Sequence, residues 1–300
     1  MKIRSVAIVW SCLLVTPLAA ADLQSKGRSP APPEAQAIDI PGDIFGFTSA
    51  TGVGSVGDLG LALENDGRFG KRSGSYSVVT QKLELGYTFA ENWSIAGSVF
   101  GNMYRVRDVA IFPDNTSGYG FDGFSFEVRH RLIERTATQP FALTFALEPR
   151  WARIDGAGFQ SNAVGVEAKV QIDAPISDRL FWAMNANFAS VGQEDSATKR
   201  WSSASSTTLS SAISYAVIED KLYLGAEARW LHAFDSSVFG TLEGQALFFG
   251  PTLMAKITPN ASFNVTVQPQ IAGKARGVPG SLDLDGFERT IARAKLAIGF

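Results

Sequence analysis

ARAKLAIGF, residues 292–300, alternates between two kinds of side chain along its whole length. Leu296, Ile298 and Phe300 are apolar, whereas Arg293 and Lys295 on the other parity are charged. Successive side chains of a β-strand point to opposite faces, so this pattern predicts a strand with one apolar and one charged face. The chain is therefore expected to end in a β-sheet that separates two different environments.

The same period of two recurs from residue 58 to the C-terminus, and no stretch shows a comparable period of 3.6. We therefore predict an all-β protein with about twelve strands. The alternating segments are 58–64, 79–89, 93–105, 124–132, 141–151, 164–172, 180–188, 209–217, 222–230, 247–257, 263–271 and 292–300.

The connections between these segments alternate in length. Residues 90–92, 218–220 and 258–260 form short turns, whereas residues 106–118 and 274–285 form longer and more polar loops. Short turns at one end and long loops at the other are typical of a closed antiparallel up-and-down barrel that spans a membrane. Since lipid offers no partner for free backbone groups, the first and last strands are expected to pair.

A soluble β-sandwich also alternates, so it is the main alternative fold. Segments of about 9–14 residues match the roughly 9–11 residues of a tilted transmembrane strand better than the average of about 5–6 in soluble proteins. Aromatic residues also fall at strand ends, where a membrane interface would lie. The predicted interface belt consists of Trp93, Trp151, Trp182, Trp201, Trp230 and Phe300.

The face opposite the apolar one carries charges near the middle of many segments. In a barrel this face lines the lumen, where opposite charges on neighbouring strands pair, whereas a charge facing lipid at the midplane would cost about 2–4 kcal/mol. The predicted lumen-lining residues are Glu84, Glu127, Arg129, Glu148, Arg150, Glu167, Lys169, Glu227, Arg229, Arg293 and Lys295.

Three prolines lie inside the predicted strands, at positions 149, 251 and 269. Proline has no N–H to donate to a sheet ladder, so bulges or gaps in pairing are expected there. Pro251 and Pro269 lie at comparable distances from the 258–260 turn, so that hairpin is expected to be distorted.

The N-terminus reads as a secretory signal peptide. Lys2 and Arg4 precede an apolar run, and Ala19–Ala21 supply a cleavage site, so residues 1–21 are expected to be removed. Cys12, the only cysteine, lies in this run, which excludes disulfides from the mature chain. Residues 22–57 are expected to form a Pro- and Gly-rich N-terminal segment before a barrel of residues 58–300. Whether residues 43–57 form a strand, lie in the periplasm or at the barrel mouth, or plug the lumen stays open.

The last eight residues, Arg293 to Phe300, resemble the terminal signal of Gram-negative outer-membrane β-barrel proteins, and the start at Ala21-Asp22-Leu23 resembles surface-antigen and porin-like members of that superfamily. The resemblance implies a cell-envelope protein of the outer membrane. It also implies partners: the lipid bilayer, and the barrel-assembly machinery that recognises the last strand.

Two functional classes fit a lumen of mixed charge. A water-filled lumen would pass small polar solutes and act in transport, whereas a plugged lumen would suit a structural or surface-interaction protein. An outer-membrane lipid hydrolase with His232 as its base is a remote alternative, and we expect no enzyme. No cofactor or metal site is expected, because no His/Asp/Glu cluster has ligand-like spacing. Removing Lys2 and Arg4 from the 27 basic residues leaves 25 against 29 acidic ones, so nucleic acid is not an expected partner.

Overall fold

A computed structural model describes residues 40–112, 114–195 and 198–300. The predicted signal peptide and residues 22–39 of the predicted N-terminal segment lie outside the described residues. In the described parts of the chain, no helix is long and apolar enough to cross a membrane.

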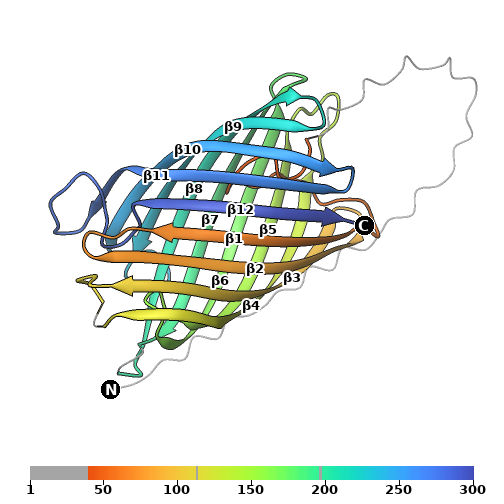
Figure 1. Ribbon diagram of the computed structural model, residues 1–300. Helices are drawn as coiled ribbons and strands as arrows, with labels where there is room; N and C mark the ends of the chain where they lie inside the picture. The colour runs from red at the N-terminus through yellow and green to blue at the C-terminus, as the bar shows by residue number, and fades with distance from the viewer. Residues whose placement is uncertain (1–39, 113, 196–197) are drawn as a thin grey trace, which may run out of the picture. The chain divides into compact units, whose positions relative to one another are not determined.

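In the described residues, twelve antiparallel strands form one closed barrel (Figure 1). Each strand pairs with its neighbours in sequence, and β1 pairs with β12, which confirms the all-β barrel, the strand count and the predicted closure. The strands are β1 (Leu59–Phe69), β2 (Ser75–Ala90), β3 (Trp93–Arg107), β4 (Thr116–Ile133), β5 (Ala142–Ile154), β6 (Gln160–Pro175), β7 (Leu180–Glu194), β8 (Trp201–Ile218), β9 (Leu222–Phe234), β10 (Leu242–Thr258), β11 (Ala261–Ala275) and β12 (Thr290–Gly299).

The closing pair β1–β12 shows how the alternation sets the register. Leu63 lies opposite Leu296, Glu64 opposite Lys295 and Asp66 opposite Arg293. Apolar residues therefore meet apolar ones and acidic residues meet basic ones across the seam. A shift by one residue would turn each charged side chain to the apolar face, so the register is strongly specified.

The outer face of the barrel is apolar. Leu83, Phe124 and Val164 are each about half exposed there, at 46%, 53% and 56%. Soluble proteins rarely leave so many large apolar side chains in one continuous surface, whereas a barrel in lipid presents such a band. The polar side chains of the same strands point to the interior.

The prolines disturb the ladders as predicted. The β10–β11 pairing is interrupted between Phe248 and Thr252, opposite residues 266–270, and this gap contains both Pro251 and Pro269. The β4–β5 pairing is likewise interrupted between Arg150 and Leu147, on either side of Pro149. Both interruptions confirm that the missing N–H groups locally open the sheet.

Several strands extend further toward the long loops than the alternation predicts. β4 begins at Thr116 rather than at residue 124, and β8 begins at Trp201 rather than at residue 209. The added stretches, 116–123 and 201–208, are rich in Gly, Ser and Thr. The exposed aromatics of the first, Tyr119 and Phe121, are on the parity opposite to that of Phe124, because the β3–β4 register shifts between them. The backbones of both stretches still pair with neighbouring strands, so the barrel continues toward the long loops.

Replacing Leu83 with Arg is expected to destabilise the barrel by about 2–4 kcal/mol, because a guanidinium at mid-height would face hydrocarbon. Urea unfolding in lipid vesicles measures the effect. Tyr119→Arg, near the long-loop end of β4, is the matched control and should cost no more than about 1 kcal/mol. Equal costs at both positions would contradict a membrane-facing surface at Leu83.

Candidate functional site: the barrel lumen and the segment inside it

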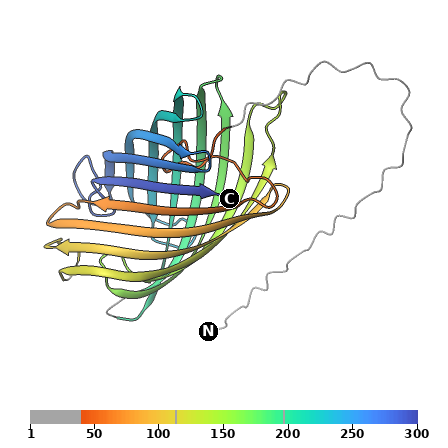
Figure 2. The ribbon, with the colours of Figure 1, turned by 45° about the vertical axis from the view of Figure 1, so that its right-hand side comes forward.

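Residues 40–58, here called the lumenal segment, fold into the barrel before β1 begins (Figure 2). Ile44 and Phe45 are 0% and 2% exposed, and they pack with Phe181 and Tyr223 of the barrel wall near the short-turn end. The segment forms no strand in the described residues. The sequence left the position of residues 43–57 open, and the structure shows these residues inside the barrel.

Glu227 of β9 holds the middle of the lumenal segment. Its carboxylate accepts hydrogen bonds from the backbone N–H of Phe47 at 2.8 Å and from the backbone N–H and hydroxyl of Thr48 at 2.6 Å each. The Gln268 amide donates a further bond at 2.9 Å. A buried carboxylate with four donors is well satisfied, and charge-assisted bonds of this kind are stronger than neutral ones.

Asp173 of β6 holds the segment at a second point, close to the short-turn end. It accepts hydrogen bonds from the backbone N–H of Thr51 at 2.7 Å and from its hydroxyl at 2.9 Å, and it pairs with Arg135. The Thr144 hydroxyl donates to the carbonyl of Thr51 at 2.8 Å. Two separate carboxylates, on β9 and on β6, thus fix the segment by its backbone.

Phe47 contacts two arginines of the wall. The guanidinium carbons of Arg229 and Arg293 are 4.2 Å and 4.4 Å from the centre of its ring. A cation over the face of an aromatic ring is attracted by the negative quadrupole of that ring. The segment therefore reaches the mid-height charges of the barrel at this residue.

Gly46 lies where the segment comes closest to the wall. A Cβ atom there would overlap the Glu227 carboxylate and lie 2.9 Å from Thr266 Cγ2. Gly42 of the same segment has nothing within 4 Å of such an atom. The close approach at Gly46 therefore requires glycine, whereas the position of Gly42 does not.

The mid-height charges form a network of ion pairs across strands. Lys169 forms an ion pair with Glu148, and its Nζ lies 2.8 Å from a carboxylate oxygen of Glu127 and 3.7 Å from one of Glu167. The Arg293 guanidinium donates hydrogen bonds to both carboxylate oxygens of Asp66, at 2.7 and 2.8 Å. Paired and hydrogen-bonded charges of this kind tolerate the interior, where single charges would not.

The structure brings the predicted lumen-lining residues together on the inner face. Each of the eleven either lines an interior cavity or binds the lumenal segment. Sequence reasoning missed further members of the network. These are Asp43, Glu64, Asp66, Lys82, Asp122 and Asp173.

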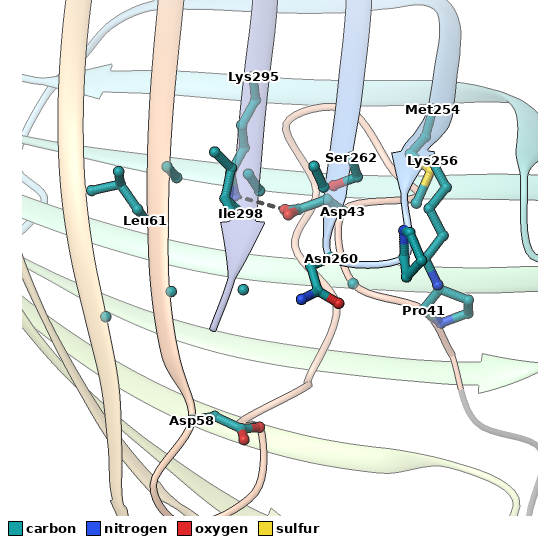
Figure 3. Close-up of a pocket in the computed structure, with 18 of the residues that line it drawn as sticks. Pro41, Asp43, Asp58, Leu61, Met254, Lys256, Asn260, Ser262, Lys295 and Ile298 are labelled. Atoms are coloured by element: carbon teal, nitrogen blue, oxygen red, sulfur yellow. Dashed lines mark hydrogen bonds and ion pairs between the residues drawn. The ribbon is translucent and has the colours of Figure 1, made fainter.

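Four cavities lie along the inner wall beside the lumenal segment. The mouth cavity, at the short-turn end, has a volume of about 610 Å³, and Lys295 reaches across it to Asp43 of the segment at 2.6 Å (Figure 3). A lower cavity of about 610 Å³, a middle cavity of about 430 Å³ and an upper cavity of about 390 Å³ follow toward the long loops.

Neighbouring cavities share walls. The mouth and lower cavities share Lys295, the lower and middle cavities share Lys169, and the middle and upper cavities share Arg150. The four spaces therefore follow one another from one end of the barrel to the other. The lumenal segment narrows the barrel without filling it.

The middle cavity carries balanced charge. Four of its lining residues are acidic and four are basic, so no single sign dominates the field inside it. The acidic residues are Glu64, Asp66, Glu148 and Glu167, and the basic ones are Lys82, Arg150, Lys169 and Arg293.

The aromatic residues assigned to an interface belt lie on the outer surface. Trp93, Trp201, Trp230 and Phe300 are exposed, while Trp151 and Trp182 are half-buried. The Trp93 ring stacks on the His130 ring, with 4.0 Å between the ring centres. The backbone N–H of Phe300 donates a hydrogen bond to the carbonyl of Leu59 at 2.8 Å. Their contact with a membrane interface stays a prediction.

His232 lies among aromatic residues at the long-loop end of β9. Its Nδ1 is 3.1 Å from the Thr207 hydroxyl oxygen, and the centre of its ring is 4.5 Å from the centre of the Trp230 ring. Within the described residues, no serine hydroxyl or carboxylate forms a hydrogen bond with this ring. A nucleophile–base–acid relay needs such partners.

Asp283 is a buried carboxylate in the long loop between β11 and β12. Its Oδ1 accepts from the Gly286 N–H at 2.8 Å, while Oδ2 has no hydrogen-bond partner among the described residues. Burial raises the pKa of this carboxyl and the charge of Asp285 adds a smaller rise, whereas hydrogen bonds from the backbone N–H groups of Gly286 and Asp285 and the charge of Lys71 oppose it. The folded loop therefore binds a proton more tightly than an opened loop would.

Packing of the 276–289 loop is expected to weaken as the pH rises through this raised pKa, because ionised Asp283 is buried without full compensation. Hydrogen exchange of the loop, corrected for intrinsic rates, measures the effect. Asp283→Asn should abolish the pH dependence, whereas Asp285→Asn, which removes the partner of Arg72 and one negative charge near Asp283, should keep it and move it to slightly lower pH. An unchanged pH dependence in Asp283→Asn would refute this assignment.

A closed antiparallel barrel with an apolar exterior and a charged interior defines the class of outer-membrane β-barrel proteins. Two solved structures are similar. The COG4313 outer membrane channel from Pseudomonas putida F1 is 11% identical, with a TM-score of 0.58 over 87% of this chain and 100% of that chain. The beta domain of the Bordetella autotransporter BrkA is 12% identical, with a TM-score of 0.52 over 81% and 100%. At these identities the likeness shows the fold alone.

The chain belongs to the family of unknown function DUF6662, whose model matches residues 41–300. This match includes the lumenal segment from Pro41 onward as well as the barrel. The comparison with curated proteins gives no match.

Proposed function

We propose that this protein is an outer-membrane channel that lets small polar solutes pass through the space beside the lumenal segment. The observation that carries the proposal is the series of four cavities that share walls from the short-turn end to the long-loop end. The predicted signal peptide and the terminal strand support its location and its insertion by the barrel-assembly machinery. The solved channel with the same fold is consistent with this role.

The charges of the wall fit polar solutes better than apolar ones. Water and small hydrophilic molecules find donors and acceptors along the whole series of cavities, whereas an apolar solute would have to displace water from charged groups. Balanced charge in the middle cavity predicts weak preference between cations and anions.

A structural or surface role with a closed lumen is the second candidate. The observation that favours it is the firm seating of the lumenal segment on Glu227 and Asp173. A lipid hydrolase is not favoured, because the contacts of His232 do not provide a catalytic relay. A lipase assay of the wild type and His232→Ala tests it, and activity lost only in the variant would support it.

Planar-bilayer recording tests the channel directly. The wild-type protein should give stepwise conductance, and Arg150→Gln should change the step size because Arg150 lines both the middle and the upper cavity. Arg179→Gln, an exposed residue at a short turn, is the control and should leave it unchanged. Folded protein that inserts without conductance would favour the structural role.

A further inference from the structure

The upper cavity differs from the rest of the lumen in the way its charges are paired. It has a volume of about 390 Å³ and lies below the long loops, beside Phe47 of the lumenal segment. Its lining includes Arg68, Arg150, Arg229 and Arg293. A cavity of this size suits a small organic molecule.

The acidic residues of this cavity are already engaged. Asp66 binds Arg293, Asp122 binds Arg150 at 2.7 Å, and Glu288 binds Lys71 at 3.2 Å. Asp155 accepts backbone hydrogen bonds from Ala157 and Phe159, each at 2.9 Å. Asp155 keeps its charge, but neither it nor any of the other three carboxylates forms an ion pair with Arg68 or Arg229 among the described residues.

Two of the arginines have no such partner. Among the residues that the structure describes, no carboxylate forms an ion pair with Arg68 or Arg229, and the guanidinium of Arg229 lies over the ring of Phe47. Both guanidiniums line the cavity from β1 and β9. Guanidinium groups present donors in a fork that matches a carboxylate, so these two arginines offer donors that no carboxylate of the described residues occupies.

The same cavity has an apolar side. Phe47, Leu231 and Ile154 belong to its lining, and Phe47 and Leu231 pack against the buried pair Phe248 and Ile291. An apolar cluster inside an otherwise charged lumen gives a second recognition element. A small inorganic anion would use the arginines but would not cover this surface.

We propose that the upper cavity is a binding site for small organic carboxylates, with the carboxylate at Arg68 and Arg229 and the apolar body against Phe47 and Leu231. The proposal deepens the proposed function, on which it rests, because it names a solute class for the same lumen. Binding is a separate property from conduction, so the two can be tested apart.

Isothermal titration of the detergent-solubilised full chain with benzoate tests the site. Saturable binding is expected, and Arg68→Gln should weaken it about tenfold, as loss of one charge-assisted contact does. Arg68→Lys, which keeps the charge but loses the fork of donors, should bind more weakly than the wild type and more tightly than Arg68→Gln. Arg179→Gln at the opposite end of the barrel is the control and should bind like the wild type.

Benzyl alcohol and acetate separate the two recognition elements. Benzyl alcohol lacks the charge and acetate lacks the apolar body, so each should bind much more weakly than benzoate. Benzoate binding that is absent, or equal in the wild type and Arg68→Gln, would overturn the proposal even if the protein conducts ions. Benzoate binding without any conductance would instead overturn the proposed channel and leave the site standing.

Discussion

Gly46→Val is expected to raise the single-channel conductance by on the order of twofold or more, since a twelve-stranded barrel without its inner obstruction approaches an open lumen. The added side chain would overlap the Glu227 carboxylate and crowd Thr252 and Thr266. The hydrogen bonds from Phe47 and Thr48 to Glu227 would then be lost, and the lumenal segment would leave its seat. The wall itself is unaltered, so the barrel should still fold.

Gly42→Val is the matched control, because a side chain at Gly42 meets nothing within 4 Å. Gly42 lines the mouth cavity, so the conductance of Gly42→Val should differ only slightly from that of the wild type. Glu227→Gln should behave like Gly46→Val, since a neutral amide accepts the same N–H groups more weakly. Equal conductance in Gly46→Val and the wild type would show that the seat on Glu227 does not limit the pathway.

Lys169→Met should make the channel cation-selective and less stable. The substitution leaves Glu127, Glu148 and Glu167 without the cation that they share. Charge in the middle cavity then changes from four against four to four acidic against three basic residues. We expect a loss of about 2 kcal/mol, less than the roughly 3–5 kcal/mol of a dry buried pair, because the cavity admits water.

Reversal potentials in a salt gradient measure the selectivity, and urea unfolding measures the stability. Lys221→Met, at an exposed short turn, is the control for a lost lysine elsewhere and should change neither. If Lys169→Met kept the wild-type reversal potential, solutes would not pass through the middle cavity.

The barrel was predictable because every strand has lipid on one face and the polar lumen on the other. Apolar and polar side chains must therefore alternate along each strand. Leu63 and Leu296 face outward and Glu64 and Lys295 inward, so alternation alone fixes both register and closure. The Gly- and Ser-rich stretches at the starts of β4 and β8 escaped prediction. In β4 a register shift between Phe121 and Gly123 moves the outward aromatics to the other parity, and in β8 residues 202–208 are mostly Ser and Thr.

The site was predictable only in part. Glu127, Lys169 and Arg293 follow from parity, and the same parity places Glu64 and Lys82 inside. The position of Asp43 and the rest of the lumenal segment could not be predicted. The segment has no hydrophobic period, and its backbone N–H groups make many of its contacts with the wall, which the side-chain pattern does not reveal. The apolar residues Ile44, Phe45 and Phe47 within a polar stretch were the one available signal of burial.

A reversible cross-link between the lumenal segment and the wall tests most directly whether solutes pass beside the seated segment. Thr48 Oγ1 lies 2.9 Å from Ser210 Oγ, and Cys12 is the only native cysteine. In a Cys12→Ser chain, Thr48→Cys with Ser210→Cys should therefore form a disulfide under mild oxidation. We predict stepwise conductance that is the same before and after reduction. Conductance that appears only after reduction would contradict passage beside the segment and show that it must leave the lumen.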